Sequence, residues 1–285
     1  MTMFSPRPRP ADLPDFAEPP VDEVVIGLMF MSISGFSTNH VAKYRDAVKH
    51  DFPGLQYQPR LIVQLENLTA EPFTAQSPFP QAGLLLPMAP QSAQRTWLVS
   101  ADDQRVLQIQ DDAFLSNWRK RADPYPRFEP LLEGFCQRFT LFRTLVDTDN
   151  VIPLQLQQLE VTYINWIPLE TSRPESWFAP AASSYVRDGK TMLGPEHLNW
   201  NASYLLRDND VPSARMHARQ LEGLRTGPGL PHVGAQLELT YRSPLPPGVS
   251  DDEIVSRAFQ ARDAIVWAFT GLTTEEAHER WGIRT

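Results

Sequence analysis

The sequence predicts an α+β protein with a mostly antiparallel sheet of seven or eight strands. Three observations support this class. The first half of the chain alternates strand-like and helix-like segments in the order β-α-β-β-α-β, which is the order of a ferredoxin-like unit. Three strand-like segments then follow one another as a β-meander. A long amphipathic helix comes after them near the C-terminus.

The first half opens with a continuous apolar run at residues 22–33, which predicts a buried strand. A helix is expected over 37–52, because serine, threonine and asparagine begin it and a Pro-Gly pair follows it. We expect a short strand at 60–68, where leucine, isoleucine and valine cluster.

Residues 95–110 contain two apolar runs and predict a hairpin with its turn at Ala101–Gln104. Residues 126–146 predict the clearest helix, because apolar side chains recur every three or four positions. The members of this stripe are Leu132, Phe135, Cys136, Phe139, Phe142 and Val146. Residues 154–169 then return to a strand pattern.

The second half predicts three strands, at 198–207, 214–222 and 233–242. The last of them alternates apolar and polar residues, which is typical of an antiparallel sheet with one covered face. A Ser-x-x-Glu capping box opens a helix over 250–272, and a final short helix is expected at 273–281.

Proline use indicates where the chain is irregular. The chain has 27 prolines, about twice the usual ~5%. They predict a flexible Pro-rich arm at 1–20 and a mobile insertion at about 67–94. We expect residues 21–285 to form a single compact domain, with a subdivision near 168–195 as the alternative.

Composition limits the partners and the compartment. The net charge of −8 and the pI of about 5.3 argue against general binding to nucleic acid, which needs many cations to neutralise phosphates. The single cysteine excludes an internal disulfide and fits a reducing compartment. The N-terminus lacks the apolar core of a signal peptide, and the longest apolar run is too short to span a bilayer. We therefore expect a cytoplasmic protein with no membrane contact.

Strong catalytic motifs are absent from the sequence. It has no G-x-S-x-G elbow, no Walker loop and no G-x-G-x-x-G after a strand. The six histidines form no pair at metal-ligand spacing, so no metal and no cofactor are predicted. Cys136 lies on the apolar stripe of its helix, which favours a buried thiol over a nucleophile. We assign no catalytic residue.

The polar face of the meander is the first candidate binding surface. Its side chains are expected to converge if the strand register allows, and they include one titratable histidine. The candidate residues are Asn199, Asn201, Arg215, His217, Arg219, Glu238 and Arg242. The structural alternative is a solvated sheet face with charge pairs between neighbouring strands.

The stretch AFLSNWRKRADPYPRFEP, residues 113–130, is the second candidate. Basic and aromatic residues alternate in it, as they do in single-strand nucleic-acid platforms. The candidate residues are Arg119, Lys120, Tyr125 and Arg127. The structural alternative is a corner that leads from a strand into a helix, with its prolines fixing the bend.

These segments also carry a family resemblance. PPVDEVVIGLMF, LQIQDDAFLSNWRK followed by YPRFEPLLEGF, LEVTYINWIP and TTEEAHERWG together resemble a sporadically distributed family of bacterial proteins of unknown function. The resemblance covers Pro19 to Gly282 and centres on Asn117-Trp118-Arg119 with Tyr125-Pro126. It implies one domain and a bacterial cytoplasm, and its patchy distribution suggests defence or mobile elements by analogy. It implies no chemistry.

The sequence thus predicts a non-enzymatic binding or interaction protein. Its partner is expected to be another protein or a second copy of the chain, and nucleic acid has weaker support because the excess of cations is small. The alternative is an enzyme of unrecognised type that acts on a nucleotide or nucleic acid, with His217 and Glu238 converging beside arginines.

Overall fold

The computed structural model describes residues 4–69, 94–149, 153–169, 177–178, 186–187, 190–191, 199–225 and 232–284. Nine strands build the main sheet: Val21–Phe30 (β2), Gly54–Pro59 (β3), Gln94–Val99 (β4), Arg105–Gln110 (β5), Ala113–Arg119 (β6), Leu156–Pro168 (β7), Trp200–Asp208 (β10), Val211–Arg225 (β11) and His232–Pro244 (β12). The helices are Thr38–Val48 (α1), Phe128–Asp149 (α2), Asp251–Leu272 (α3) and Glu275–Arg280 (α4). Two small pairs are Asp15–Phe16 (β1) with Ile283–Arg284 (β13) and Val186–Arg187 (β8) with Lys190–Thr191 (β9).

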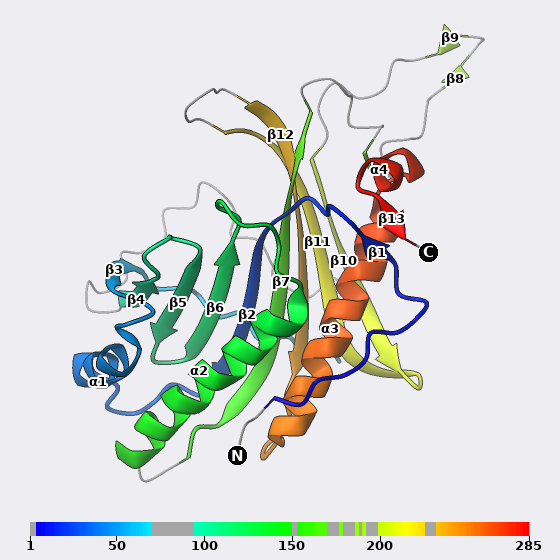
Figure 1. The fold of residues 1–285 in the computed structure, drawn as a ribbon. Helices are drawn as coiled ribbons and strands as arrows, with labels where there is room; N and C mark the ends of the chain where they lie inside the picture. The colour runs from blue at the N-terminus through cyan, green and yellow to red at the C-terminus, as the bar shows by residue number, and fades with distance from the viewer. Residues whose placement is uncertain are drawn as a thin grey trace.

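The main sheet is antiparallel throughout, in the order β10-β11-β12-β7-β2-β6-β5-β4-β3. The long helices α2 and α3 lie side by side on one of its faces (Figure 1). The predicted α+β class with a large antiparallel sheet is confirmed. The expected count of seven or eight strands is too low, because the described residues place nine strands in this sheet alone.

The predicted β-α-β-β-α-β order of the first half is wrong in detail. Four strands, β3 to β6, stand between α1 and α2. The second strand of the predicted hairpin is β5, and a two-residue turn at Asp111-Asp112 joins it to β6. The strand expected at 60–68 lies instead at Gly54–Pro59. Leu61 and Val63 are not part of a strand, and their apolar side chains pack on a small buried cluster of the sheet.

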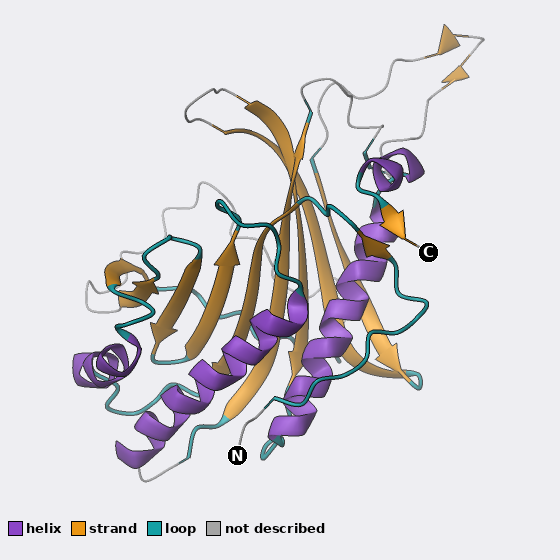
Figure 2. Ribbon diagram, in the orientation of Figure 1, coloured by secondary structure: helices purple, strands orange, loops and turns teal. Residues whose placement is uncertain are grey.

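The core lies between the sheet and the two long helices, and Figure 2 shows both helices over the strands. All six predicted apolar residues of α2 are buried. Phe114 of β6 lies at the centre of an aromatic cluster, with ring centroids 5.0–6.0 Å from Tyr44, Phe135, Phe139 and Phe142. The rings contribute large apolar areas and favourable tilted contacts. Cys136 is buried as predicted, and burial raises the pKa of its thiol to about 12.

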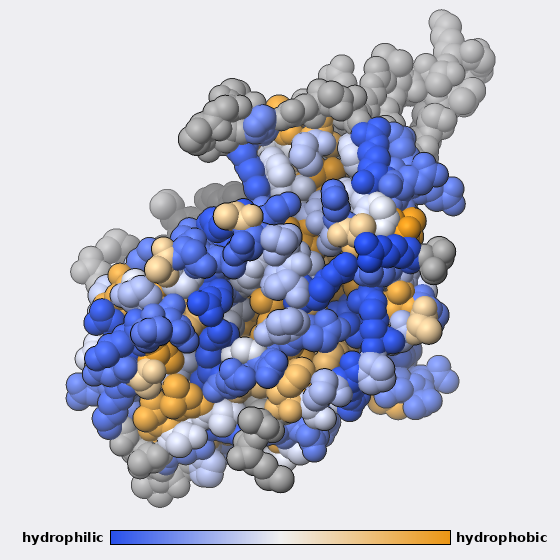
Figure 3. Space-filling model, in the orientation of Figure 1, coloured by the Kyte–Doolittle hydropathy of each residue, from blue (hydrophilic) through white to orange (hydrophobic). Residues whose placement is uncertain are grey.

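The last strand of the meander and the helix after it follow the predicted pattern from Ala235 onward. In β12 every second side chain is buried in the core, from Ala235 to Tyr241. Ser250 caps α3 by accepting a hydrogen bond from the Glu253 N–H. Outside this core, the helix-bearing side of the molecule is mostly hydrophilic (Figure 3). No helix in the described part of the chain is long and apolar enough to cross a membrane.

Residues 4–20, most of the expected Pro-rich arm, lie against the body of the protein. The chain runs beside α3 before it enters β2 (Figure 1). β1 pairs with β13, and Phe16 contacts Phe269 and Trp281 at centroid distances of 5.4 and 6.4 Å. Phe4 contacts Phe259 further along α3. The expected insertion at 67–94 and the subdivision near 168–195 fall largely outside the described residues.

Replacing the central aromatic residue tests this core. We expect Phe114→Ala to lower the free energy of unfolding by about 3–5 kcal/mol, because the cavity cannot close around so many ring contacts. Urea denaturation followed by circular dichroism measures the loss. Trp267→Ala is the matched control, because the Trp267 side chain is 50% exposed on α3 and its removal should cost far less. Equal losses for the two variants would contradict the assigned core.

Candidate functional site

The polar face of the meander is the face of the sheet turned away from α2 and α3, and we call it the open face. In β11 the side chains of Arg215, His217 and Arg219 point to this face, alternating with core residues. The register places Arg215 beside Arg242 and Arg219 beside Glu238 on β12. The strands therefore bring five of the predicted residues onto one continuous surface.

A segment without regular secondary structure, residues 60–69, crosses the open face, and we call it the crossing segment. It begins at Arg60, whose guanidinium pairs with both Asp111 and Asp112 at the turn between β5 and β6. It ends above β11, on the other half of the sheet. The crossing segment thus joins the two halves of the open face.

Two buried glutamines hold the main chain of the crossing segment. Gln110 accepts a hydrogen bond from the Leu61 N–H at 3.1 Å and donates to the Leu61 carbonyl at 3.0 Å. Gln158 accepts from the Glu66 N–H at 2.7 Å and donates to the Gln64 carbonyl at 2.9 Å. Each glutamine therefore replaces the ladder partner that an irregular main chain lacks.

Glu66 is the centre of a charge network on the open face. Its carboxylate oxygens lie 2.6 Å from Nη1 of Arg215, 2.6 Å from Nε2 of His217 and 3.5 Å from Nη1 of Arg242. Burial alone would raise the pKa of the Glu66 carboxyl. The hydrogen bond and charge of His217 outweigh burial, together with those of Arg215 and Arg242, and they lower the pKa to about 2.

His217 connects Glu66 to an exposed hydroxyl. Its Nδ1 lies 2.9 Å from Oγ of Ser203, the residue directly opposite it on β10. Because the ionised carboxylate of Glu66 only accepts hydrogen bonds, Nε2 must carry a proton. In the neutral ring, Nδ1 then accepts from the Ser203 hydroxyl. The hydrogen bonds thus run from the serine hydroxyl to the histidine and from the histidine to the carboxylate, as they do in sites with a nucleophile, a general base and an orienting acid.

The remaining predicted residues of the open face have other roles. Burial raises the pKa of Glu238, and the neighbouring Arg219 guanidinium opposes that effect. Asn199 accepts a hydrogen bond from the Glu222 N–H at 2.9 Å, which fastens the start of β10. Asn201 is exposed on β10. Glu238, which we expected beside His217, is therefore replaced by Glu66 as the acid of that histidine.

The second candidate, the corner at 113–130, is divided between the two faces of the sheet. Arg119 lies on the open face, where it pairs with Glu23 at 3.4 Å and Asp103 at 3.7 Å and lies over the ring of Trp97. Lys120 follows it as an exposed side chain. Of these two cations, Arg119 is thus the one that its contacts place on the side away from the helices.

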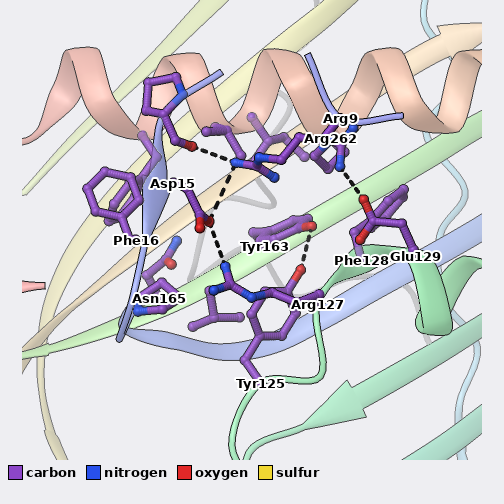
Figure 4. A pocket seen from close by; sticks show the side chains of 16 residues that line it. Arg9, Asp15, Phe16, Tyr125, Arg127, Phe128, Glu129, Tyr163, Asn165 and Arg262 are labelled. Carbon is purple, nitrogen blue, oxygen red and sulfur yellow. Dashed lines mark hydrogen bonds and ion pairs between the residues drawn. The ribbon is translucent and has the colours of Figure 1, made fainter. Parts of the chain in front are cut away.

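Tyr125 and Arg127 lie on the helix side and line a small pocket (Figure 4). The Tyr125 hydroxyl lies 2.9 Å from the Tyr163 hydroxyl, and Arg127 pairs with Asp15 at 2.7 Å. Burial raises the pKa of Tyr125, and the bond to Tyr163 opposes it. The four predicted corner residues therefore form no single cationic surface.

The pocket in Figure 4 is small and its charges are paired. Its volume is about 60 Å³, room for water but not for a substrate. On the α3 side, Arg262 pairs with Glu129 at 2.6 Å. Arg127 has a φ of 76°, which costs a non-glycine residue on the order of 1 kcal/mol or more. Its ion pair with Asp15 helps to offset that cost.

The described residues contain no group of three or more histidine, cysteine, aspartate or glutamate side chains that could hold a metal ion.

Glu66 is the functional candidate that sequence reasoning missed. The predicted face carried four potential cations, Arg215, His217, Arg219 and Arg242, against one carboxylate, Glu238. That imbalance is a signal that a carboxylate comes from elsewhere in the chain. It does not say which carboxylate, because the crossing segment has no strand periodicity to place it.

The chain matches no known family model, no curated protein and no solved structure. The resemblance to the sporadically distributed bacterial family therefore stays a prediction from the quoted segments.

The Glu66 network predicts a pH-dependent contribution to stability. The pKa of Glu66 is lowered from 4.5 to about 2, so its carboxylate stabilises the fold above pH 4.5 and loses that effect as the pH falls toward 2. We expect Glu66→Gln to lower the free energy of unfolding by roughly 3 kcal/mol at pH 7. The difference from wild type should shrink below pH 4.5.

Urea denaturation at several pH values measures this difference. Glu276→Gln is the matched control, because Glu276 forms an exposed ion pair with Arg280 on α4, worth less than about 1 kcal/mol. A loss for Glu66→Gln that is the same at pH 7 and at pH 3 would contradict the network.

Proposed function

We propose that the protein is a non-enzymatic interaction protein that binds an extended segment of a protein partner along its edge strand β10. The observation that carries this proposal is the exposure of that edge. β10 ends the main sheet and pairs only with β11 among the described strands. Its neighbouring residues Tyr204 and Leu205 are 43% and 38% exposed. Because successive side chains of a strand alternate, these two lie on opposite faces.

An unprotected edge strand is a binding feature. Its outer N–H and C=O groups can form a ladder with another extended chain, and proteins usually block such edges with lysine, proline or bulges. β10 contains no lysine and no proline. Its register stays regular from Trp200 to Leu206, and the one irregularity comes between Leu206 and Arg207, near the end of the strand. The opposite edge, β3, is shorter and ends at Pro59. The unprotected edge is therefore the one beside the predicted polar face.

The predicted site residues support this location. Asn201 is exposed on β10, and Ser203 lies on the same face as His217. A partner segment along β10 would meet these side chains and Leu205. By contrast, Arg119 and Arg127 bind carboxylates of the protein itself. A cytoplasmic location and a link to bacterial defence belong to this proposal, on the basis of the single buried cysteine and the family resemblance.

A charge placed on the edge tests the proposal. We expect Leu205→Lys to abolish co-purification of the partner from the native host, because natural edges use lysine to block pairing. Trp267→Lys is the matched control, since Trp267 is also exposed but lies on α3, away from the edge. Cross-linking mass spectrometry should map the partner to residues 200–208.

Cross-links that map to another part of the surface, or a partner that Leu205→Lys still captures, would contradict the edge as the binding site. Light scattering measures whether a second copy of the chain, rather than a different protein, occupies the β10 edge. A dimer that Leu205→Lys dissociates would assign the edge to a second copy of the chain.

A second candidate function is an enzyme acting on a nucleotide or nucleic acid. The observation that favours it is the chain from Ser203 through His217 to Glu66, in which the hydroxyl is exposed and the carboxylate is fixed by two arginines. In this candidate His217 takes a proton from Ser203, and Glu66 orients the ring.

A fluorophosphonate probe separates this candidate from a binding protein. A nucleophilic serine attacks the phosphorus of the probe and releases fluoride, so an enzyme should be labelled at Ser203. His217→Ala should then reduce labelling by about 100-fold or more, in line with the contribution of a general base. Ser213→Ala is a control, because the Ser213 hydroxyl bonds only to a main-chain carbonyl. A wild-type protein that stays unlabelled would contradict a serine mechanism.

A further inference from the structure

A second and larger cavity lies on the helix side of the sheet. Its volume is about 440 Å³, within the range of small-molecule sites. The first half of α2 and the strands β2, β5 and β6 surround it, and the corner at 113–130 contributes Asp123, Pro124 and Pro126 to its lining. Apolar side chains of Ile26 and Trp118 form part of its wall. Neither candidate function described above uses this cavity.

Two arginines line the cavity without a carboxylate bound to either of them. The guanidinium groups of Arg105 and Arg138 lie 5.3 and 5.2 Å from the centroid of the Phe52 ring. Within the described part of the chain, neither group forms a hydrogen bond or an ion pair. The arginines of the open face are different in this respect, because Arg215 and Arg242 both bind Glu66.

This arrangement is unfavourable for the protein alone. Burial lowers the pKa of Arg138, and the charge of Arg105 lowers it further. Two aspartates, Asp51 and Asp102, are near enough to interact electrostatically with Arg138 and Arg105, but both have other hydrogen-bond partners. Asp51 contacts His50, and Asp102 bonds to a serine hydroxyl and a main-chain N–H of its own turn. A buried cation that faces a like charge without a bound anion costs stability, so this arrangement points to an anion supplied from outside.

Ser116 contributes a hydroxyl to the wall of this cavity. Ser116 stands on β6 between Phe114 and Trp118, facing the helices in a row that is otherwise aromatic. Its side chain forms no hydrogen bond within the described residues. A serine hydroxyl both donates and accepts, so it can bond to an oxygen of a ligand.

We propose that this cavity binds a small phosphorylated molecule, with the phosphate held by Arg105 and Arg138 and the rest of the ligand against Trp118. Guanidinium groups match phosphate oxygens through paired, charge-assisted hydrogen bonds. The exposed Asp102 and Asp123 also line the cavity. Together with the net charge of −8, they disfavour a polyanion such as nucleic acid. The ligand is therefore a small phosphate ester.

Isothermal titration calorimetry on the full chain tests the proposal, with inorganic phosphate, adenosine 5′-monophosphate and adenosine as probes. We expect saturable binding of the monophosphate, weaker binding of inorganic phosphate and none of adenosine. Arg105→Gln and Arg138→Gln should each weaken binding by about tenfold or more, the usual effect of losing a charge-assisted hydrogen bond. Arg121→Gln is the matched control, because Arg121 is an exposed arginine of the same corner that pairs with Asp103.

Thermal unfolding without ligand provides a second measurement. Arg138→Gln should melt at the same temperature as wild type or higher, because it removes a desolvated charge that opposes Arg105. The proposal is overturned if neither phosphate compound binds. It is also overturned if the Arg121 variant loses as much affinity as the two cavity variants, or if Arg138→Gln unfolds the protein. This site shares no residue with the β10 edge, so either proposal can fail alone.

Discussion

A nine-stranded sheet has two faces to cover, and this constraint governs the rest of the structure. The helices α2 and α3 cover one face and build the aromatic core on it. The other face is covered in part by the crossing segment, a main chain without regular structure. Such a chain can lie on a sheet only where side chains supply the hydrogen bonds that a ladder would provide. Gln110 and Gln158 meet that requirement, because they bond to main-chain groups of Leu61, Gln64 and Glu66.

The charges of the protein fall into two groups with different consequences. Around Glu66, opposite charges meet in one buried network, and these contacts lower the pKa of that carboxyl and favour its ionised form. Removing one partner of such a network is costly, which fits a structural role. Arg105 and Arg138 share a cavity wall without a bound carboxylate, so their position is better explained by a ligand. Arginines therefore stabilise the fold on the open face of the sheet, whereas on the helix side two arginines are available to bind a ligand.

Local patterns were sufficient for much of the fold. The stripe on α2, the capping serine of α3 and the alternation in β12 depend on neighbours three, four or two positions away, and the structure confirms them. The prediction failed at residues 60–68, where apolar content suggested a strand. Those side chains are buried by crossing the sheet rather than by joining it. Periodicity cannot separate the two cases, because both place apolar residues against a covered surface.

The sequence by itself determined the α+β class, the long helices with their buried faces and the polar face of the meander, because each depends on short-range periodicity. It also placed Arg215, His217 and Arg242 on that face. Only the tertiary structure decided that Glu66 joins them, that the cations of the corner separate onto two faces, and that Arg105 and Arg138 both lie over the ring of Phe52. These pairings join residues far apart in the chain. They follow from strand order and from the path of an irregular segment, which no local pattern encodes.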